Sequence, residues 1–448
     1  MSDLLSIGLS GVSAYRTALA AVGDNVANAE NEGYARRSVR FAEGGRTGEE
    51  GIGQATSFRF TGIKAASVDR AWDDFQAQES RLAASADGRA GTRAYWLEQV
   101  EGSLGYGELS VGSRIGAFFN AGTALAANPK DRLGRSAMLA ALDDAAATIR
   151  NTAEALKSSG AAISAAAGRE VEALNGDLEA LARVNVSLLQ AAPGRSSTAS
   201  LQDERDRLID SIARRVDVSV SLADNGIATL TLARAPGVTL IEPAGRGLVV
   251  LSTATDGRLS LSLADNGTTI PLPASGGTIS GLVDVAASTA DKRADLEAIT
   301  AQFVSELNAW SAAGRDLAGN PGGPLLTMSA GALSVTTAIT DPDLVAAASA
   351  TADNGNLLDL PSLRGGDGVE AKWAALVAGS AQTLASAKSE AAAASTRRDN
   401  SFAARDETSG IDLDREAAEL MRFQQAYGAS TRIIQVARET LQSILDLF

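Results

Sequence analysis

The sequence predicts a mainly α-helical protein. Its two termini form an α-helical coiled coil, joined to a helical-bundle domain with one inserted small β domain. Three observations lead to this fold class. Apolar residues repeat every seven positions near both ends of the chain, residues 130–192 contain no proline, and apolar residues alternate with polar ones over 216–222 and 259–263. Periods of seven and of two are typical of coiled-coil helices and of half-buried strands, respectively.

The first element considered is the C-terminal stretch 409–448. Positions three residues after its repeat add Phe423, Ala437 and Ile444, interrupted by Glu416 and Ser430. Such a line of apolar side chains is buried only against a partner helix, where each side chain fits between residues of the other helix. The members of the repeat are Leu413, Leu420, Tyr427, Ile434, Leu441 and Phe448.

The N-terminal stretch offers a matching helix, from about residue 3 to residue 29. Its repeat consists of Leu5, Val12, Leu19 and Val26. The alternative is two ordinary amphipathic helices that pack on a globular core. Because the repeats lie at both extreme ends of the chain, we favour a coiled coil and predict that all ten residues form an assembly interface. The Asn- and Gly-rich end of this helix leads into an extended arm over 34–61, so the terminal domain comprises residues 1–61 and 409–448.

Composition excludes several classes of function. The chain has 40 basic and 54 acidic residues, a net charge of −14, and neither cysteine nor histidine. Nucleic acids and anionic membranes are bound by concentrated Lys and Arg, so we expect neither partner. Without histidine or thiolate ligands we expect no metal, no cofactor and no enzyme activity. We also find no cleavable signal peptide and no stretch of about 18 apolar residues, and so expect no membrane insertion.

A helical domain is predicted over 62–213 and 286–408. The chain should be helical from residue 63 to 190, where Leu142, Ile149, Leu156 and Ile163 repeat in sevens, as one very long helix or a helix pair. Asn185 lies on this pattern and has two interpretations: a buried residue that sets the register, or a residue exposed to solvent. We favour the exposed position.

A short helix over 200–216 carries a run of charges. Asp203 and Arg207, like Asp210 and Arg214, stand four residues apart, which is the spacing of surface ion pairs. We therefore interpret the run as a solvated helix face above Leu201, Leu208 and Ile212, rather than as a functional site.

The inserted β domain is predicted over 214–285. The same hexapeptide, SLADNG, occurs at 221–226 and at 262–267, and in both places it follows an alternating run. Asn-Gly favours tight hairpin turns, so the domain should contain at least two similar hairpins. Helix should resume near Thr289, and a Gly/Pro-rich loop over 314–325 and irregular chain over 339–363 should precede a final helix over 373–408.

Both ends of the chain resemble bacterial flagellar rod, hook and hook-associated proteins. The N-terminal signature is carried by residues 10–15 (SGVSAY), 23–29 (GDNVANA) and 33–36 (GYAR), with Asn-Glu at 31–32 where the family usually has Thr-Pro. The C-terminal signature is carried by residues 409–414 (SGIDLD) and 422–427 (RFQQAY). Two internal stretches, 203–210 (DERDRLID) and 314–325 (GRDLAGNPGGPL), resemble the hook-associated member of the hook–filament junction.

This resemblance implies a structural subunit of the bacterial flagellum that forms a ring or short helical layer between hook and filament. It also implies export through the flagellum's own channel without a cleaved signal peptide, and therefore an extracellular location. The implied partners are other copies of the chain, the flagellar hook protein, a second junction protein and a dedicated export chaperone that binds the C-terminal helix.

Two alternatives remain open. A hook or rod subunit would share both terminal signatures, but it should be mainly β outside its ends, whereas this chain has long Ala-rich stretches over 130–190 and 371–408. An enzyme that uses carboxylates would need paired acids in one pocket, whereas the acidic residues here are spread along helix faces.

Overall fold

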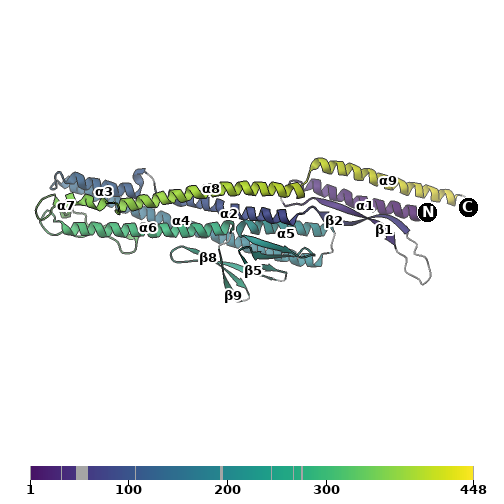
Figure 1. Ribbon diagram of the computed structural model, residues 1–448, viewed down its shortest axis with the longest axis horizontal. Helices are drawn as coiled ribbons and strands as arrows, with labels where there is room; N and C mark the ends of the chain where they lie inside the picture. Colours follow the sequence, from purple (N-terminus) through teal and green to yellow (C-terminus); the bar gives the residue numbers. More distant parts are fainter. Residues whose placement is uncertain are drawn as a thin grey trace.

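The computed structural model shows an elongated molecule with both chain termini at the same end (Figure 1). It describes residues 2–31, 33–46, 59–105, 107–191, 195–243, 245–265, 267–273 and 276–446. Long helices dominate and small sheets lie beside them, which confirms the prediction of a mainly α fold with an inserted small β domain.

The bundle is built from helices that run along the long axis of the molecule. They are α2 (Asp74–Gly102), α3 (Val111–Leu125), α4 (Arg132–Gln190), α6 (Gly277–Ala313) and α8 (Val369–Ser409). α4 is a single helix of 59 residues, begun by Asp131, whose carboxylate accepts hydrogen bonds from the backbone N–H groups of Leu133 and Gly134. Those N–H groups have no partner inside the helix, so the cap stabilises its first turn.

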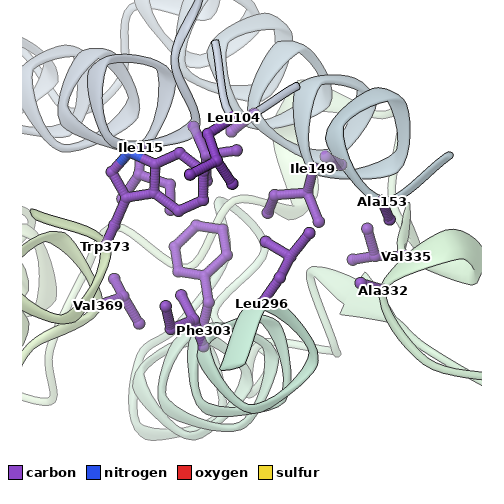
Figure 2. Close-up of a cluster of buried hydrophobic side chains, with 14 of the residues drawn as sticks. Leu104, Ile115, Ile149, Ala153, Leu296, Phe303, Ala332, Val335, Val369 and Trp373 are labelled. Carbon is purple, nitrogen blue, oxygen red and sulfur yellow. The ribbon is translucent and has the colours of Figure 1, made fainter. Parts of the chain in front are cut away.

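A continuous hydrophobic core holds the bundle together. Figure 2 shows Phe303 of α6 and Trp373 of α8 between Ile115 of α3 and Ile149 of α4. All four side chains are less than 5% exposed. The chain has few aromatic residues, so most of this core consists of Leu, Ile, Val and Ala. The irregular chain between α6 and α8 closes the far end with α7 (Gly355–Asp359) and the short pair β10 (Leu326–Thr327) and β11 (Thr336–Thr337).

The inserted β domain consists of two antiparallel sheets. The first has the order β3 (Val218–Leu222), β4 (Ala228–Leu232), β5 (Ala235–Glu242) and β6 (Gly245–Arg246). The second has the order β7 (Leu248–Thr253), β8 (Leu259–Asp265) and β9 (Thr268–Leu272). Gly226 and Gly267 each have a φ of 82° in the β3–β4 and β8–β9 turns, as the repeated hexapeptide predicts. Asn266 lies outside the described residues.

The helical start after the β domain is earlier than predicted. α6 begins at Gly277 and not near Thr289 as predicted. Residues 277–285 are therefore helical and do not belong to the β sheets. Ile279 is fully buried and joins the hydrophobic cluster that the two sheets share with α4 and with α5 (Ser196–Arg215). This shared burial stabilises a helical turn that the Gly- and Ser-rich sequence alone does not indicate.

The predicted extended arm is a hairpin of two long strands, β1 (Arg37–Arg46) and β2 (Arg59–Arg70). The expectation that residues 63–70 are helical is therefore wrong. Their backbone pairs with β1, for instance Val68 with Val39 and Ile63 with Glu43. This pairing satisfies backbone hydrogen bonds that helix formation would otherwise supply.

The interpretation of Asn185 as solvent-exposed is also wrong. Asn185 is fully buried, its Nδ2 donates to the carbonyl of Ala228 at 2.8 Å, and its Oδ1 accepts from the N–H of Ala228 at 3.0 Å. One asparagine side chain thus satisfies both backbone groups of the first residue of β4, before the pairing of β4 with β5 begins at Leu230. The helical pattern could not reveal this role, because the partner lies 43 residues away.

The terminal helices α1 (Ser2–Ala27) and α9 (Leu413–Leu445) lie side by side at the end of the rod, together with the β1–β2 hairpin. Residues 410–412 separate α9 from α8, so the C-terminal helix changes direction where it leaves the bundle. By length and hydropathy alone, Leu4–Ala27 would also qualify as a membrane span. A third of its most apolar window is buried in the structure, and apolar helices of soluble proteins meet the same criterion.

Candidate functional site

α1 and α9 pack as a close antiparallel pair. Gly8 lies under Ile434, Gly11 under Ser430, and Asn25 beside Glu416, so the numbers rise along one helix and fall along the other. A Cβ atom added to Gly8 would stand 2.6 Å from Cγ1 of Ile434. That separation is far below van der Waals contact, so the approach of the two helices requires a residue without a side chain at this position.

The line of residues that α9 buries is not the one predicted as its main repeat. Glu416, Phe423, Ser430 and Ala437 stand seven apart, and each is at most 7% exposed. They include both residues that we interpreted as interruptions. The predicted repeat lies beside the contact instead of in it. The contact surface of α1 includes the small residues Gly8 and Gly11, so α9 packs on it through the residues three positions after the predicted repeat.

The ten predicted interface residues therefore divide into three groups. Half-buried at the border of the pair are Val12, Leu19, Leu420, Tyr427 and Ile434. Exposed are Leu5 (37%), Val26 (47%), Leu413 (55%) and Leu441 (51%). Phe448 lies outside the described residues. Contact of these residues with another subunit stays a prediction.

The hairpin is fastened to the helix pair by an aromatic cluster. Phe41 of β1 lies 5.6 Å from Tyr15 of α1 and 6.0 Å from Phe423 of α9, measured between ring centroids. The tilted and edge-on arrangements of these rings are the favourable ones for aromatic pairs. α1, α9 and β1 consequently share one small hydrophobic core with Ala18 and Val22 at its centre.

A buried polar contact joins the same three elements where α1 ends. Asn25 Nδ2 donates to Glu416 Oε2 at 2.9 Å and to the carbonyl of Arg37 at 2.9 Å. Asn25 Oδ1 accepts from the N–H of Arg37 and from the hydroxyl of Tyr34. Arg36 Nε donates to Glu416 Oε1 at 2.6 Å. Glu416 and Asn25 are both 0% exposed, yet each of their polar atoms has a partner.

Behind this contact, a network of ion pairs connects the terminal elements to the bundle; we call it the joint. Asp203 of α5 pairs with Arg37 at 2.7 Å and with Arg70 at 2.8 Å. Asp206 pairs with Arg70 at 2.9 Å and, less closely, with Arg81 of α2. Asp210 pairs with Arg81 at 2.7 Å and with Arg405 of α8 at 2.8 Å. Within α5, Arg205 pairs with Asp206 at 2.8 Å.

The interpretation of the charge run as a solvated face is therefore wrong. Arg205 is 2% and Asp206 1% exposed, and the predicted pairing of Asp203 with Arg207 is replaced by contacts with the hairpin. Burial lowers the pKa of Arg205, and Asp206 opposes that shift. The signal in the sequence was the spacing of three and four between Asp203, Asp206 and Asp210, which places all three carboxylates on one helix face.

Two open clefts flank the joint, of about 680 Å³ and about 940 Å³. Tyr34 and Arg207 line both of them. Burial raises the pKa of Tyr34 to about 12, although the neighbouring Arg37 acts in the opposite direction. Among the described residues no group of three or more carboxylates is placed to hold a metal ion. The acids around the joint pair with arginines, an arrangement that fastens elements together.

Large apolar side chains remain exposed on both terminal helices. On α1 they include Leu4, Leu5, Leu9 and Val26, each 37–54% exposed. On α9 they include Leu413, Met421, Ile433, Val436 and Leu441, each 38–58% exposed. We call these nine residues, which are spread along both helices, the outward apolar face. Large apolar side chains left exposed on two neighbouring helices are candidates for protein–protein contact.

Fold and site together define an elongated helical protein whose paired terminal helices leave large apolar side chains exposed. Sequence comparison gives this class a biological setting. Residues 404–447 match the C-terminal region of flagellar basal body rod FlgEFG proteins. The C-terminal helix is thus of the type found in proteins of the flagellar axis.

A longer match identifies the family. Residues 97–326, half of the chain, match the helical domain of flagellar hook-associated protein FlgK, and the chain belongs to this family. It is 25% identical to flagellar hook-associated protein 1 of Bacillus subtilis (strain 168), over 97% of this chain and 96% of that protein.

Two further relatives are similar over less of their length. Flagellar hook-associated protein 1 of Salmonella typhimurium is 26% identical over 72% of this chain and 59% of that protein. The structure of the flagellar hook junction protein FlgK from Burkholderia pseudomallei superimposes with a TM-score of 0.51 and 20% identity, over 56% of this chain and 47% of that one. The likeness to the solved structure concerns the fold alone.

Proposed function

We propose that this protein is a structural subunit of the flagellum that forms the layer between hook and filament. Copies stand side by side, and the outward apolar faces of their terminal helices meet in a ring or short helical layer. The bundle and the β domain lie away from this contact. Membership of the hook-associated family and the similarity to proteins named flagellar hook-associated protein 1 support this function.

The outward apolar face is the observation that carries the proposal. Complete burial of a leucine or valine side chain contributes about 1.5–3 kcal/mol, and these side chains, about half exposed in the monomer, would gain roughly half of that. Because every copy brings the same nine side chains, the gain is repeated at each contact of the layer. The face occurs on the helices that hold both terminal signatures of the flagellar family.

The same proposal names the partners and the location. The hook protein and a second junction protein bind at the two sides of the layer, and a dedicated export chaperone covers the exposed side chains of α9 before export. The chain leaves the cell through the flagellar channel without a cleaved signal peptide and works outside it. It has no enzymatic role, and the arginine partners of the carboxylates at the joint agree with this.

The alternative role of a hook or rod subunit rests on the match of residues 404–447 to rod proteins. The match of the helical domain to the hook-associated family favours the junction.

Leu441→Asp tests the assembly role. Leu441 is 51% exposed, so an aspartate there is solvated in the monomer, and the melting temperature of the purified protein should not change. In the layer the carboxylate would be buried without a partner. We expect cells that make only this variant to complete the hook, to release filament protein into the medium and not to swim. Leu441 separates assembly from folding better than Ile434, whose side chain lies over Gly8.

Leu189→Asp is the matched control, since Leu189 is a 66% exposed leucine on α4, outside the terminal helices. Cells with this variant should swim normally. Normal filaments on cells with Leu441→Asp, with the variant present at the junction, would contradict the proposed contact.

A further inference from the structure

The residues at the contact between α1 and α9 select the register in which the two helices pack. The contact residues of α1 include Gly8, Gly11 and Ala18. Gly11 and Ala18 stand one heptad apart, so a shift of α9 by seven residues would exchange one small residue for another. Packing opposes the shift that would bring Ile434 over Tyr15 instead of Gly8, but in the opposite shift small residues of α1 still face α9, so packing discriminates weakly against it.

Polar groups in the contact discriminate strongly. The buried line of α9 has two polar members, Glu416 and Ser430. The Ser430 hydroxyl donates to the carbonyl of Ala426 within its own helix, so it can keep this bond in any register. Glu416 instead depends on Asn25 of α1 and on Arg36, at 2.9 Å and 2.6 Å.

A shift by one heptad would break these contacts in either direction. In one direction Glu416 would face Ala18, and in the other Asn25 would face the ring of Phe423. A buried carboxylate without its partners is strongly destabilising, and the shift would also separate Phe423 from Tyr15 and Phe41.

We propose that Glu416, held by Asn25 and Arg36, determines the register in which the C-terminal helix docks on the N-terminal helix. The register places the side chains of α1 relative to those of α9 on the outward apolar face. Glu416 is thus a positioning residue for assembly, without itself contacting another subunit. This last step rests on the proposed function; the control of register does not.

The natural chain contains no cysteine, so introduced cysteine pairs can report the register in the full-length purified protein. Gly11→Cys with Ser430→Cys reports the native register, because a Cβ at Gly11 would stand 3.1 Å from that of Ser430, and a slight separation of the helices brings the two to the spacing of about 3.5–4.5 Å of a disulfide. Ala18→Cys with Ser430→Cys reports a shift in one direction, and Gly11→Cys with Phe423→Cys reports the other. Oxidation followed by mass spectrometry measures the fraction of each pair that forms a disulfide.

With Glu416 present, we expect the native pair to cross-link and the shifted pairs to stay at background. In Glu416→Leu the shifted pairs should rise at least about tenfold relative to the native pair, which corresponds to about 1.4 kcal/mol of lost register preference. Glu439→Leu is the matched control, the same substitution at an exposed position of α9, and should leave the native pattern unchanged. Glu416→Gln keeps a side chain that can bond to Asn25 and should also retain the native register.

In Glu416→Leu alone, the buried Asn25 would lose a hydrogen-bond partner, and this could prevent the two helices from docking. The double variant Asn25→Leu with Glu416→Leu removes both polar side chains and so avoids this effect. It should cross-link in both native and shifted registers. Cross-linking of this variant in the native register alone would overturn the proposal, and so would a complete loss of cross-linking. These readouts use the monomer, so they succeed or fail independently of assembly; Leu441→Asp, which should not assemble, is expected to keep the native register.

Discussion

At the scale of single residues, asparagine side chains fasten helices to strands. Asn175 and Asn185 both lie on α4, and each bonds to the N–H and the carbonyl of one strand residue, Val249 and Ala228 respectively. Each of the two β sheets is therefore held by one carboxamide. The terminal helix uses the same device, because Asn25 bonds to both backbone groups of Arg37.

Asn185→Leu tests this role. The substitution leaves the buried N–H and carbonyl of Ala228 without their partner, and each such group costs about 1–3 kcal/mol. We expect the free energy of unfolding, measured by urea denaturation, to fall by at least that amount. Asn151→Leu, at an exposed position of the same helix, should change it by less than about 0.5 kcal/mol. Equal effects of the two substitutions would contradict the role of the carboxamide.

Tyr34 makes the terminal elements sensitive to alkaline pH. Its pKa of about 12 in the folded protein exceeds the ordinary value of 10.0, because burial disfavours the phenolate. Between these values the unfolded chain loses the proton first, so the stabilising contribution is complete below pH 10 and falls as the pH rises toward 12.

Comparison with Tyr34→Phe isolates this effect from other alkaline titrations. The variant loses the hydrogen bond to Asn25 and should be less stable at pH 8. The difference in urea midpoint between the two proteins should then shrink from pH 10 to pH 12. A difference that is constant over this range would show that Tyr34 keeps an ordinary pKa.

At the scale of secondary-structure elements, the joint decides how the terminal helices are attached. α5 supplies the acids and Arg205, whereas the other arginines come from the hairpin, from α2 and from α8. Segments far apart in the sequence thus meet on one face of a short helix. Two of its members, Arg70 and Arg81, also lie over the ring of Trp72 at 5.0 and 5.6 Å, which adds a cation–π contact at the base of the hairpin.

Asp206→Asn should weaken this attachment. The buried guanidinium groups of Arg70, Arg81 and Arg205 would lose a shared carboxylate, and removal of one partner from a buried ion pair costs about 3–5 kcal/mol. Urea denaturation measures the loss. Glu204→Ala, whose carboxylate is exposed and pairs with Arg207 on the surface, should cost at most about 1 kcal/mol. Comparable losses in both variants would show that burial of the joint adds nothing.

At the scale of the whole molecule, two large hydrophobic cores follow one another along the rod, in addition to the small core of the terminal elements. The larger core lies among α2, α3, α4, α6 and α8 (Figure 1). The second lies between the β sheets, α5 and the C-terminal part of α4, where Leu174, Leu178 and Leu181 are buried. The β domain is thus inserted in the sequence but shares its core with the bundle.

Replacement of residues 218–272 by a short Gly-Ser linker should separate the two cores. Of its buried side chains the larger core loses only Leu259, so its cooperative melting transition should persist. Leu174, Leu178 and Leu181 would become exposed, and we expect faster amide hydrogen exchange around them than around Leu142 and Ile149. Unchanged exchange near Leu178 would show that the sheets do not stabilise α4, and loss of the whole transition would show that there is a single core.

The sequence by itself determined the elements whose signals are local. The heptad repeats predicted helices at both ends, and the absence of proline predicted one very long helix or a helix pair, of which α4 is the former. Asn-Gly predicted the hairpin turns, because these two residues adopt positive φ angles at lower cost than others. The terminal signatures indicated the flagellar family for a similar reason, since they lie in continuous stretches of chain.

Only the tertiary structure decided which face of each element is buried. Glu416 appeared to interrupt a repeat and Asp206 appeared to lie on a solvated face, because carboxylates are buried only when distant partners compensate their charge. Those partners, Arg36 and Arg70, are separated from them by 380 and 136 positions of the sequence. The burial of a charged group depends on the sum of its contacts in space, and this sum is not present in the local pattern of residues.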